Sequence, residues 1–136
     1  MKNEQLISLA KEAMKQAYCP YSEFSVGAAL LCGNGKIYTG CNIENASYSL
    51  CICAERTAFS KAVSDGERKF KKIAVVGGKN GKSEGFCYPC GACRQVMAEF
   101  CKEDFELFFE NENGETEVFT LGQMLPKSFR LGEKEI

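Results

Sequence analysis

Two short cysteine motifs constrain this chain more than any other feature. Cys53 stands two residues before Glu55, and Pro89 precedes the pair formed by Cys90 and Cys93. Three thiolates from these motifs can bind one zinc ion and leave its fourth tetrahedral position open to water, as in catalytic zinc sites. Glu55 would then move protons at that water. The chain must therefore fold so that two distant segments meet, and the arrangement is that expected of a hydrolase.

Both motifs are expected at the starts of helices. Cys90 and Cys93 are three residues apart, so their sulfurs project from one helix face, and Pro89 suits the start of that helix. If Cys53 opens another helix, two positive helix ends converge on the ion. Arg56 can donate from its guanidinium to a thiolate sulfur, which would reduce the excess negative charge of three thiolates.

A rival ligand set stays open at this point. Cys87 and Cys90 also form a C-x-x-C pair, and Cys51 lies two residues before the first motif's cysteine. Four cysteines would make a closed structural site, as in a zinc-binding module without catalysis. We favour the later C-x-x-C pair because Pro89 places Cys87 outside the helix. A structural zinc would also leave the neighbouring carboxylate without a role.

The composition is that of an ordinary globular protein. The chain has 136 residues, 45% apolar residues and a net charge of −1. We expect one domain over residues 1–136, with residues 131–136 as a loose tail. The charge balance favours neither nucleic-acid nor membrane binding, and no signal peptide or membrane span is visible, so a cytoplasmic location is expected. In that reducing compartment the nine cysteines are more typical of metal binding than of disulfides.

The pattern of apolar residues predicts an α/β domain. Asn3 is expected to cap the first helix, and the order of elements predicts a mixed sheet of about five strands sandwiched by helices, an α/β/α sandwich. The expected helices cover residues 3–17, 53–64, 90–101 and 121–125, and the expected strands cover residues 25–32, 36–42, 72–77, 105–109 and 117–119.

The chain resembles the small cytidine deaminase family over about residues 5–130. The signature of zinc deaminases joins H-x-E to P-C-x-x-C, and the cysteine at position 53 is similar to the all-cysteine branch that acts on free nucleosides. Three further segments carry the resemblance, residues 18–29, 40–48 and 125–129. Residues 130–136 fit no pattern of the family.

The resemblance implies a reaction and a set of roles. The reaction is hydrolytic deamination of cytidine and 2′-deoxycytidine to uridine and 2′-deoxyuridine, in pyrimidine salvage, with one zinc ion per chain. The implied assembly is a homotetramer with shared active sites. The implied roles are metal binding by Cys53, Cys90 and Cys93, proton transfer by Glu55, ribose binding by Asn42 and Glu44, base contact by Phe24 and the Ala54 backbone, and completion of a neighbouring subunit's pocket by Phe129, Ala46 and Tyr48.

Other interpretations of these residues stay open from the sequence alone. Phe24 and Phe129 could be ordinary core aromatics. Asn42 and Glu44 would be assigned to a solvated loop if they stood alone, but the zinc motifs beside them favour substrate binding. A blasticidin S-type deaminase would share the zinc motifs. The segment 42–46 favours a nucleoside substrate instead.

Overall fold

Helices and strands alternate along the chain much as the apolar pattern predicts. The computed structural model describes residues 1–84 and 87–132. Its elements are α1 (Asn3–Met14), β1 (Phe24–Cys32), β2 (Ile37–Cys41), the 3-10 helix η1 (Tyr48–Leu50), α2 (Ala54–Ser64), β3 (Phe70–Lys79), α3 (Gly91–Phe100), β4 (Glu106–Glu110), β5 (Thr116–Thr120) and α4 (Leu121–Met124).

The five strands form one mixed sheet in the order β2-β1-β3-β4-β5. Neighbouring strands are antiparallel except for β3 and β4, which run parallel with α3 crossing between them. A parallel pair needs such a long crossover, and a helix supplies it. The predicted α/β/α sandwich with a mixed five-stranded sheet is confirmed.

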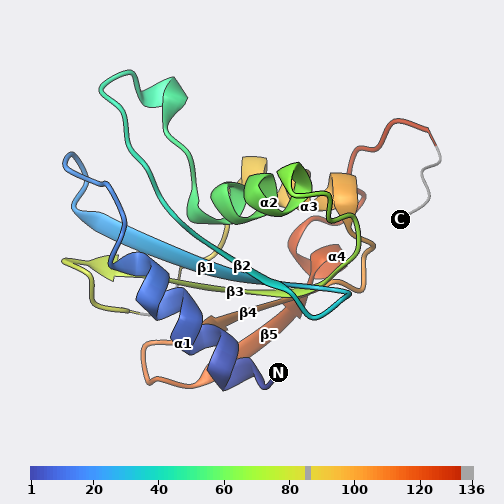
Figure 1. Cartoon of the computed structure of the whole chain (residues 1–136), viewed down its shortest axis with the longest axis horizontal. Helices are drawn as coiled ribbons and strands as arrows, with labels where there is room; N and C mark the ends of the chain where they lie inside the picture. The colour runs from blue at the N-terminus through green and yellow to red at the C-terminus, as the bar shows by residue number, and fades with distance from the viewer. Residues whose placement is uncertain (85–86, 133–136) are drawn as a thin grey trace.

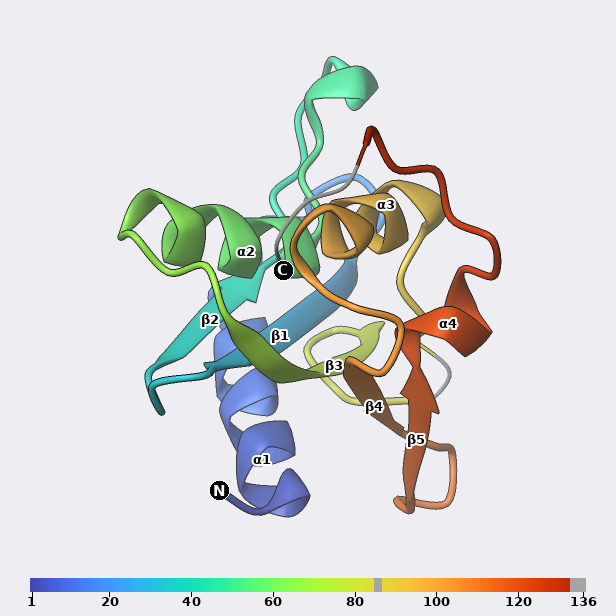
Figure 2. The same cartoon turned by 90° about the vertical axis from the view of Figure 1, so that its right-hand side faces the viewer.

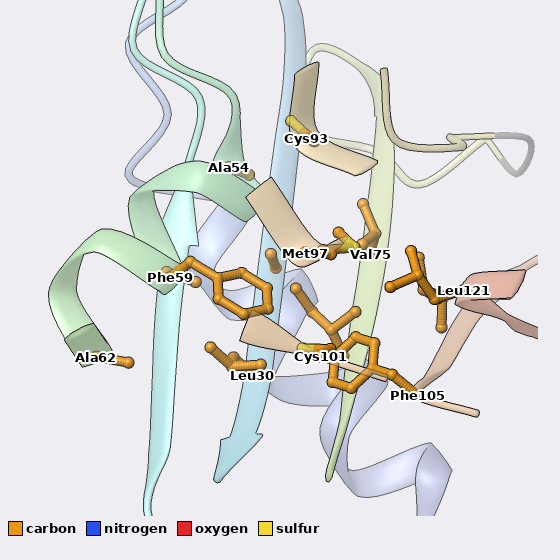
Figure 3. Packing of buried hydrophobic residues seen from close by; sticks show 14 of the residues in the cluster. Leu30, Ala54, Phe59, Ala62, Val75, Cys93, Met97, Cys101, Phe105 and Leu121 are labelled. Carbon is orange, nitrogen blue, oxygen red and sulfur yellow. The ribbon is translucent and has the colours of Figure 1, made fainter. Parts of the chain in front are cut away.

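Helices cover both faces of the sheet (Figures 1 and 2). On one face α1 packs over a smaller cluster that includes Leu6, Met14 and Phe108. On the other face α2 and α3 pack over the larger core cluster, where Phe59 and Met97 lie against the strands (Figure 3). The second face matters for function because it places the starts of α2 and α3 near each other.

The first helix departs from the prediction at both ends. Lys2 occupies the N-cap position, and its amide donates to the side-chain oxygen of Gln5 at 2.8 Å. Asn3 is therefore not the cap: its side-chain oxygen accepts a hydrogen bond from Lys72 at 2.7 Å and ties α1 to β3. The helix ends at Met14 rather than at residue 17, because the next three amides bond three residues back, in tight turns.

Two further expectations concern the ends of the chain and the membrane. Residues 133–136 of the predicted tail lie outside the described residues. In the part of the chain that is described, no helix has the length and apolarity that a membrane crossing needs.

Gly40 in β2 allows α2 to approach the sheet closely. A Cβ atom at this position would lie 2.4 Å from the carbonyl oxygen of Ala54 and 2.7 Å from the amide nitrogen of Ala58. Both are backbone atoms of α2 and cannot swing away as a flexible side chain can. The first turn of α2, which carries Glu55, can therefore lie directly against β2 because residue 40 has no side chain.

We predict that Gly40→Ala lowers the free energy of unfolding by about 1–3 kcal/mol, the usual cost of overpacking. Gly33→Ala is the matched control, because its new methyl group would meet the Cβ of Lys69 at 3.2 Å and backbone no nearer than 3.6 Å. Urea denaturation at one protein and zinc concentration measures both variants. Equal unfolding midpoints for the two variants would contradict the close approach.

Candidate active site and metal centre

The residues that cap the N-termini of α2 and α3 present free thiols. Cys53 is the N-cap of α2 and Cys90 is the N-cap of α3, both with extended backbone, and neither side chain bonds to the amides of its helix. Serine or aspartate at an N-cap would normally use its oxygen to satisfy those amides. The two sulfurs are instead available to a ligand and lie at the positive ends of two helices.

Three sulfurs form a cluster whose dimensions suit zinc. The Cys53 and Cys90 sulfurs are 3.7 Å apart, those of Cys90 and Cys93 are 3.5 Å apart, and all three lie within 4.8 Å of one another. Sulfurs at the corners of a tetrahedron, each about 2.3 Å from a zinc ion, are about 3.8 Å apart. The residues present therefore fit a zinc ion with three thiolate ligands.

Glu55 lies beside this cluster, with 4% of its surface exposed. Its oxygen Oε1 is buried and has no hydrogen-bond partner among the described residues, which is unusual because buried polar atoms are nearly always bonded. Burial raises the pKa of the Glu55 carboxyl to about 7, and the charge on Cys53 adds to the rise. A cation bound to the thiolates would oppose that shift. Glu55 therefore keeps one free acceptor oxygen beside the thiols.

Contacts within the cluster shift the pKa values of two thiols in opposite directions. Donation from the Cys93 thiol, helped by the guanidinium of Arg56, lowers the pKa of Cys53 to about 5. The same bond, with burial, raises the pKa of Cys93. Arg56 donates from Nη2 to the Cys53 sulfur at 3.8 Å and to the Cys51 carbonyl at 3.1 Å. It is thus placed where the sequence analysis expects it, against a thiolate sulfur.

A cavity of about 320 Å³ opens over the cluster and Glu55. That volume is at the lower end of the usual range for small-molecule sites. Its wall combines apolar and polar side chains from β1, the loop between β2 and α2, and the segment before α3. The lining residues are Phe24, Val26, Asn42, Ile43, Glu44, Cys51, Ile52, Cys53, Ala54, Glu55, Cys87, Tyr88 and Cys90.

Asn42 and Glu44 are held firmly in this wall. The Asn42 amide accepts from the Val26 amide and donates to the Phe24 carbonyl, both at 2.8 Å. The Glu44 carboxylate accepts from the Ser22 hydroxyl at 2.5 Å and from two backbone amides, and the Ser22 hydroxyl chiefly lowers the pKa of Glu44. Each side chain still has hydrogen-bonding capacity for a ligand. Both side chains are thus held by hydrogen bonds within the protein.

Three predicted substrate contacts are not brought into this chain's own cavity. Ala46, Tyr48 and Phe129 are all exposed and are absent from the lining. Tyr48 is 69% exposed and Phe129 is 68% exposed, so Phe129 is not a core aromatic of its own chain. Tyr48 sits on η1 at the tip of a loop that projects away from the sheet (Figure 1).

Two cysteines that compete as ligands have other contacts. Cys51 binds within its loop: its sulfur accepts from the Asn45 amide at 3.4 Å and donates to the Asn45 carbonyl at 3.7 Å. Cys87 lies in the cavity wall against Gly77, where a Cβ atom would come within 2.5 Å of the Cys87 sulfur and 3.0 Å of the Phe24 ring. Sequence reasoning missed Cys87, Tyr88 and Ile52 as wall residues, because no local pattern links them to β1 or β3.

The fold and the site together define a class of protein. A cluster of three thiols that can hold a metal ion, beside a buried carboxyl with one free oxygen and under an open cavity on an α/β/α sandwich, is typical of a zinc-binding hydrolase. A family model described as the cytidine and deoxycytidylate deaminase zinc-binding region matches residues 1–108. The chain belongs to this family of hydrolytic deaminases.

Individual relatives agree with that assignment over nearly the whole chain. The chain is 55% identical over 126 residues to a cytidine deaminase of Sporosarcina psychrophila, covering 93% of this chain and 90% of the relative. The crystal structure of cytidine deaminase from Burkholderia pseudomallei matches with a TM-score of 0.87 and 49% identity, covering 95% of this chain and all of that one. The cytidine deaminase structure from Mycobacterium tuberculosis matches with a TM-score of 0.81 and 37% identity, covering 96% and 99%.

We predict that serine at Cys53, Cys90 or Cys93 lowers the bound zinc well below one ion per chain, because each substitution removes a thiolate ligand. Serine at Cys51 or Cys87 should leave zinc bound, since neither belongs to the sulfur cluster. Metal analysis of the five purified variants after the same dialysis makes the comparison. Loss of zinc in Cys87→Ser would overturn this ligand set.

Proposed function

We propose that this chain deaminates cytidine and 2′-deoxycytidine to uridine and 2′-deoxyuridine, releasing ammonia, in a zinc-dependent reaction. The observation that carries the proposal is the free, buried oxygen of Glu55 beside the three-thiol cluster. The relatives support the substrate, because cytidine deaminases match over more than nine-tenths of the chain. The supporting cavity is also large enough for a small ligand.

The chain's own residues would divide the chemistry as follows. Cys53, Cys90 and Cys93 would hold the zinc ion, which when bound lowers the pKa of a water molecule from near 16 to roughly 7. Glu55 would take the proton that this water releases and deliver it to N3 of the pyrimidine, which makes C4 electrophilic. As the water oxygen bonds to C4, Glu55 would carry the second proton to the amino group, and the bond from C4 to nitrogen breaks to release ammonia.

The remaining predicted contacts would orient the nucleoside. Asn42 and Glu44 would bind the ribose 3′-hydroxyl, which both donates and accepts hydrogen bonds. Phe24 and the backbone of Ala54 would contact the base from the cavity wall. Arg56 would offset part of the negative charge of the thiolates, as its contact with the Cys53 sulfur suggests.

We also propose a cytoplasmic homotetramer that works in pyrimidine salvage. All nine cysteines are free, which suits a reducing compartment. Apolar side chains that have no place in the core, including Tyr48, Leu50 and Phe129, are more than 60% exposed. Neighbouring subunits would cover them, and Phe129, Ala46 and Tyr48 would complete a pocket of another subunit.

We predict that the wild-type chain deaminates cytidine and 2′-deoxycytidine in preference to cytosine, CMP and blasticidin S, measured by loss of ultraviolet absorbance in parallel assays.

Glu55→Gln should keep the fold and the zinc but reduce kcat by about 10²-fold or more, since the amide cannot shuttle protons. Activity within about tenfold of the wild type, at normal zinc content, would mean that Glu55 does not carry the proton.

The shared pocket predicts complementation between two weak variants. Phe129→Ala and Glu55→Gln, mixed in equal amounts under conditions that let subunits exchange, would regain activity in about one quarter of the pockets if each pocket receives one Phe129 from a neighbour. Mass spectrometry confirms the exchange. If the mixture only sums the activities of the separate variants, Phe129 does not act in another subunit's pocket.

A further inference from the structure

The C-terminal segment, residues 125–130, runs beside α3 (Figure 2). Side-chain hydrogen bonds join the segment to that helix. Arg94 of α3 donates to the Pro89 carbonyl at 2.8 Å and to the Met124 carbonyl at 2.6 Å. Gln95 of α3 donates to the Phe129 carbonyl at 2.8 Å. The helix that carries Cys93 therefore holds the main chain at Phe129 and, just before the segment, at Met124 in α4.

Arg130 makes the reverse connection, from the segment to the end of α3. Its guanidinium donates from Nη1 to the Ala98 carbonyl at 2.5 Å and from Nη2 to the Cys101 carbonyl at 3.0 Å. The last carbonyls of a helix have no partners within it and carry partial negative charge. A planar guanidinium can satisfy two of them at once. This contact joins residues about thirty positions apart in the chain.

The two connections hold the main chain at the Phe129 carbonyl and at the residue that follows it. Gln95 binds the Phe129 carbonyl, and Arg130, the next residue, is anchored on the far end of the same helix. The Phe129 ring nevertheless stays 68% exposed. An aromatic ring on an immobilised main chain loses little conformational freedom when it inserts into another surface.

We propose that Arg130 is a positioning residue, which fixes the exposed Phe129 ring in register with the metal-binding helix for insertion into a neighbouring subunit's pocket. The inference rests on the proposed function of Phe129 and goes beyond it, because it assigns a role to a residue outside the family resemblance. Since Cys90 caps the same helix that anchors Arg130, one rigid element would connect a subunit's own metal site to the pocket it completes.

Arg68 provides a matched control. Its guanidinium also donates to two backbone carbonyls near the end of a helix, those of Val63 and Glu67 next to α2, at 2.9 and 2.8 Å. Both arginines therefore offset the partial negative charge at the C-terminal end of a helix. Arg68 binds residues within five positions in the sequence, whereas Arg130 binds residues about thirty positions away. Removing either one tests the loss of a helix-end contact, and only Arg130→Ala also releases Phe129.

The experiment compares Arg130→Ala, Arg130→Lys, Arg68→Ala and Phe129→Ala as zinc-loaded full-length protein. We expect Arg130→Ala to lower kcat/KM for cytidine about tenfold, mostly through KM, with partial recovery in Arg130→Lys and no change in Arg68→Ala. When Phe129 is already alanine, Arg130→Ala should have no further effect on kcat/KM, because there is then no aromatic ring left to position. Additive losses, or an unchanged KM in Arg130→Ala, would overturn the proposal.

Amide hydrogen exchange of residues 125–132 supplies a readout that does not depend on the reaction. Exchange in this segment should be faster in Arg130→Ala than in the wild type and in Arg68→Ala. Unchanged exchange would overturn the positioning role even if the enzyme is active. A wild type that is inactive on cytidine, with faster exchange in Arg130→Ala, would instead contradict the proposed function and leave the anchoring of the segment in place. If Arg130→Ala does not fold, Arg130→Lys carries the same comparisons.

Discussion

The packing of α2 and α3 side by side on one face of the sheet brings two helix N-termini together, and the whole site depends on that contact. Three thiolates within 4.8 Å of one another would repel strongly in isolation. The positive ends of both helices and the guanidinium of Arg56 reduce that repulsion. Gly40 sets how closely α2 lies against the sheet, so the position of the sulfurs follows from backbone packing.

The same packing buries Glu55 without giving Oε1 a partner. An unsatisfied buried polar atom costs roughly 1–3 kcal/mol, and a protein selected for stability alone would not keep it. The cost is understandable if the carboxyl must exchange protons with a ligand rather than bond permanently to the protein. In contrast to Glu55, the side chains of Asn42 and Glu44 in the cavity wall already have hydrogen-bond partners in the backbone.

Several large apolar side chains lie exposed on the surface, outside the core and the cavity. The loop around η1 and the C-terminal segment carry Tyr48, Leu50 and Phe129 on the surface, although none of them is needed to cover the chain's own core. Their main chains are nonetheless anchored, by the Cys51 contacts in the loop and by Gln95 and Arg130 in the segment. Anchored main chain with exposed apolar side chains is the arrangement that the proposed shared pocket requires.

Local patterns in the sequence determined the elements, the mixed sandwich and the candidate residues of the metal motifs, because helix periodicity, strand runs and motif spacing depend only on near neighbours. Spacing alone offered both Cys87 and Cys93 as partners of Cys90, and the position of Pro89 favoured Cys93. The tertiary structure separated them by placing the Cys93 sulfur in the cluster and Cys87 against Gly77. In the tertiary structure Asn3 binds Lys72 and does not cap its helix. Phe129 is exposed, and Arg130 binds the end of α3. The contacts of Asn3 with Lys72 and of Arg130 with α3 could not be predicted, because each joins residues that are far apart in the chain and no local preference encodes it.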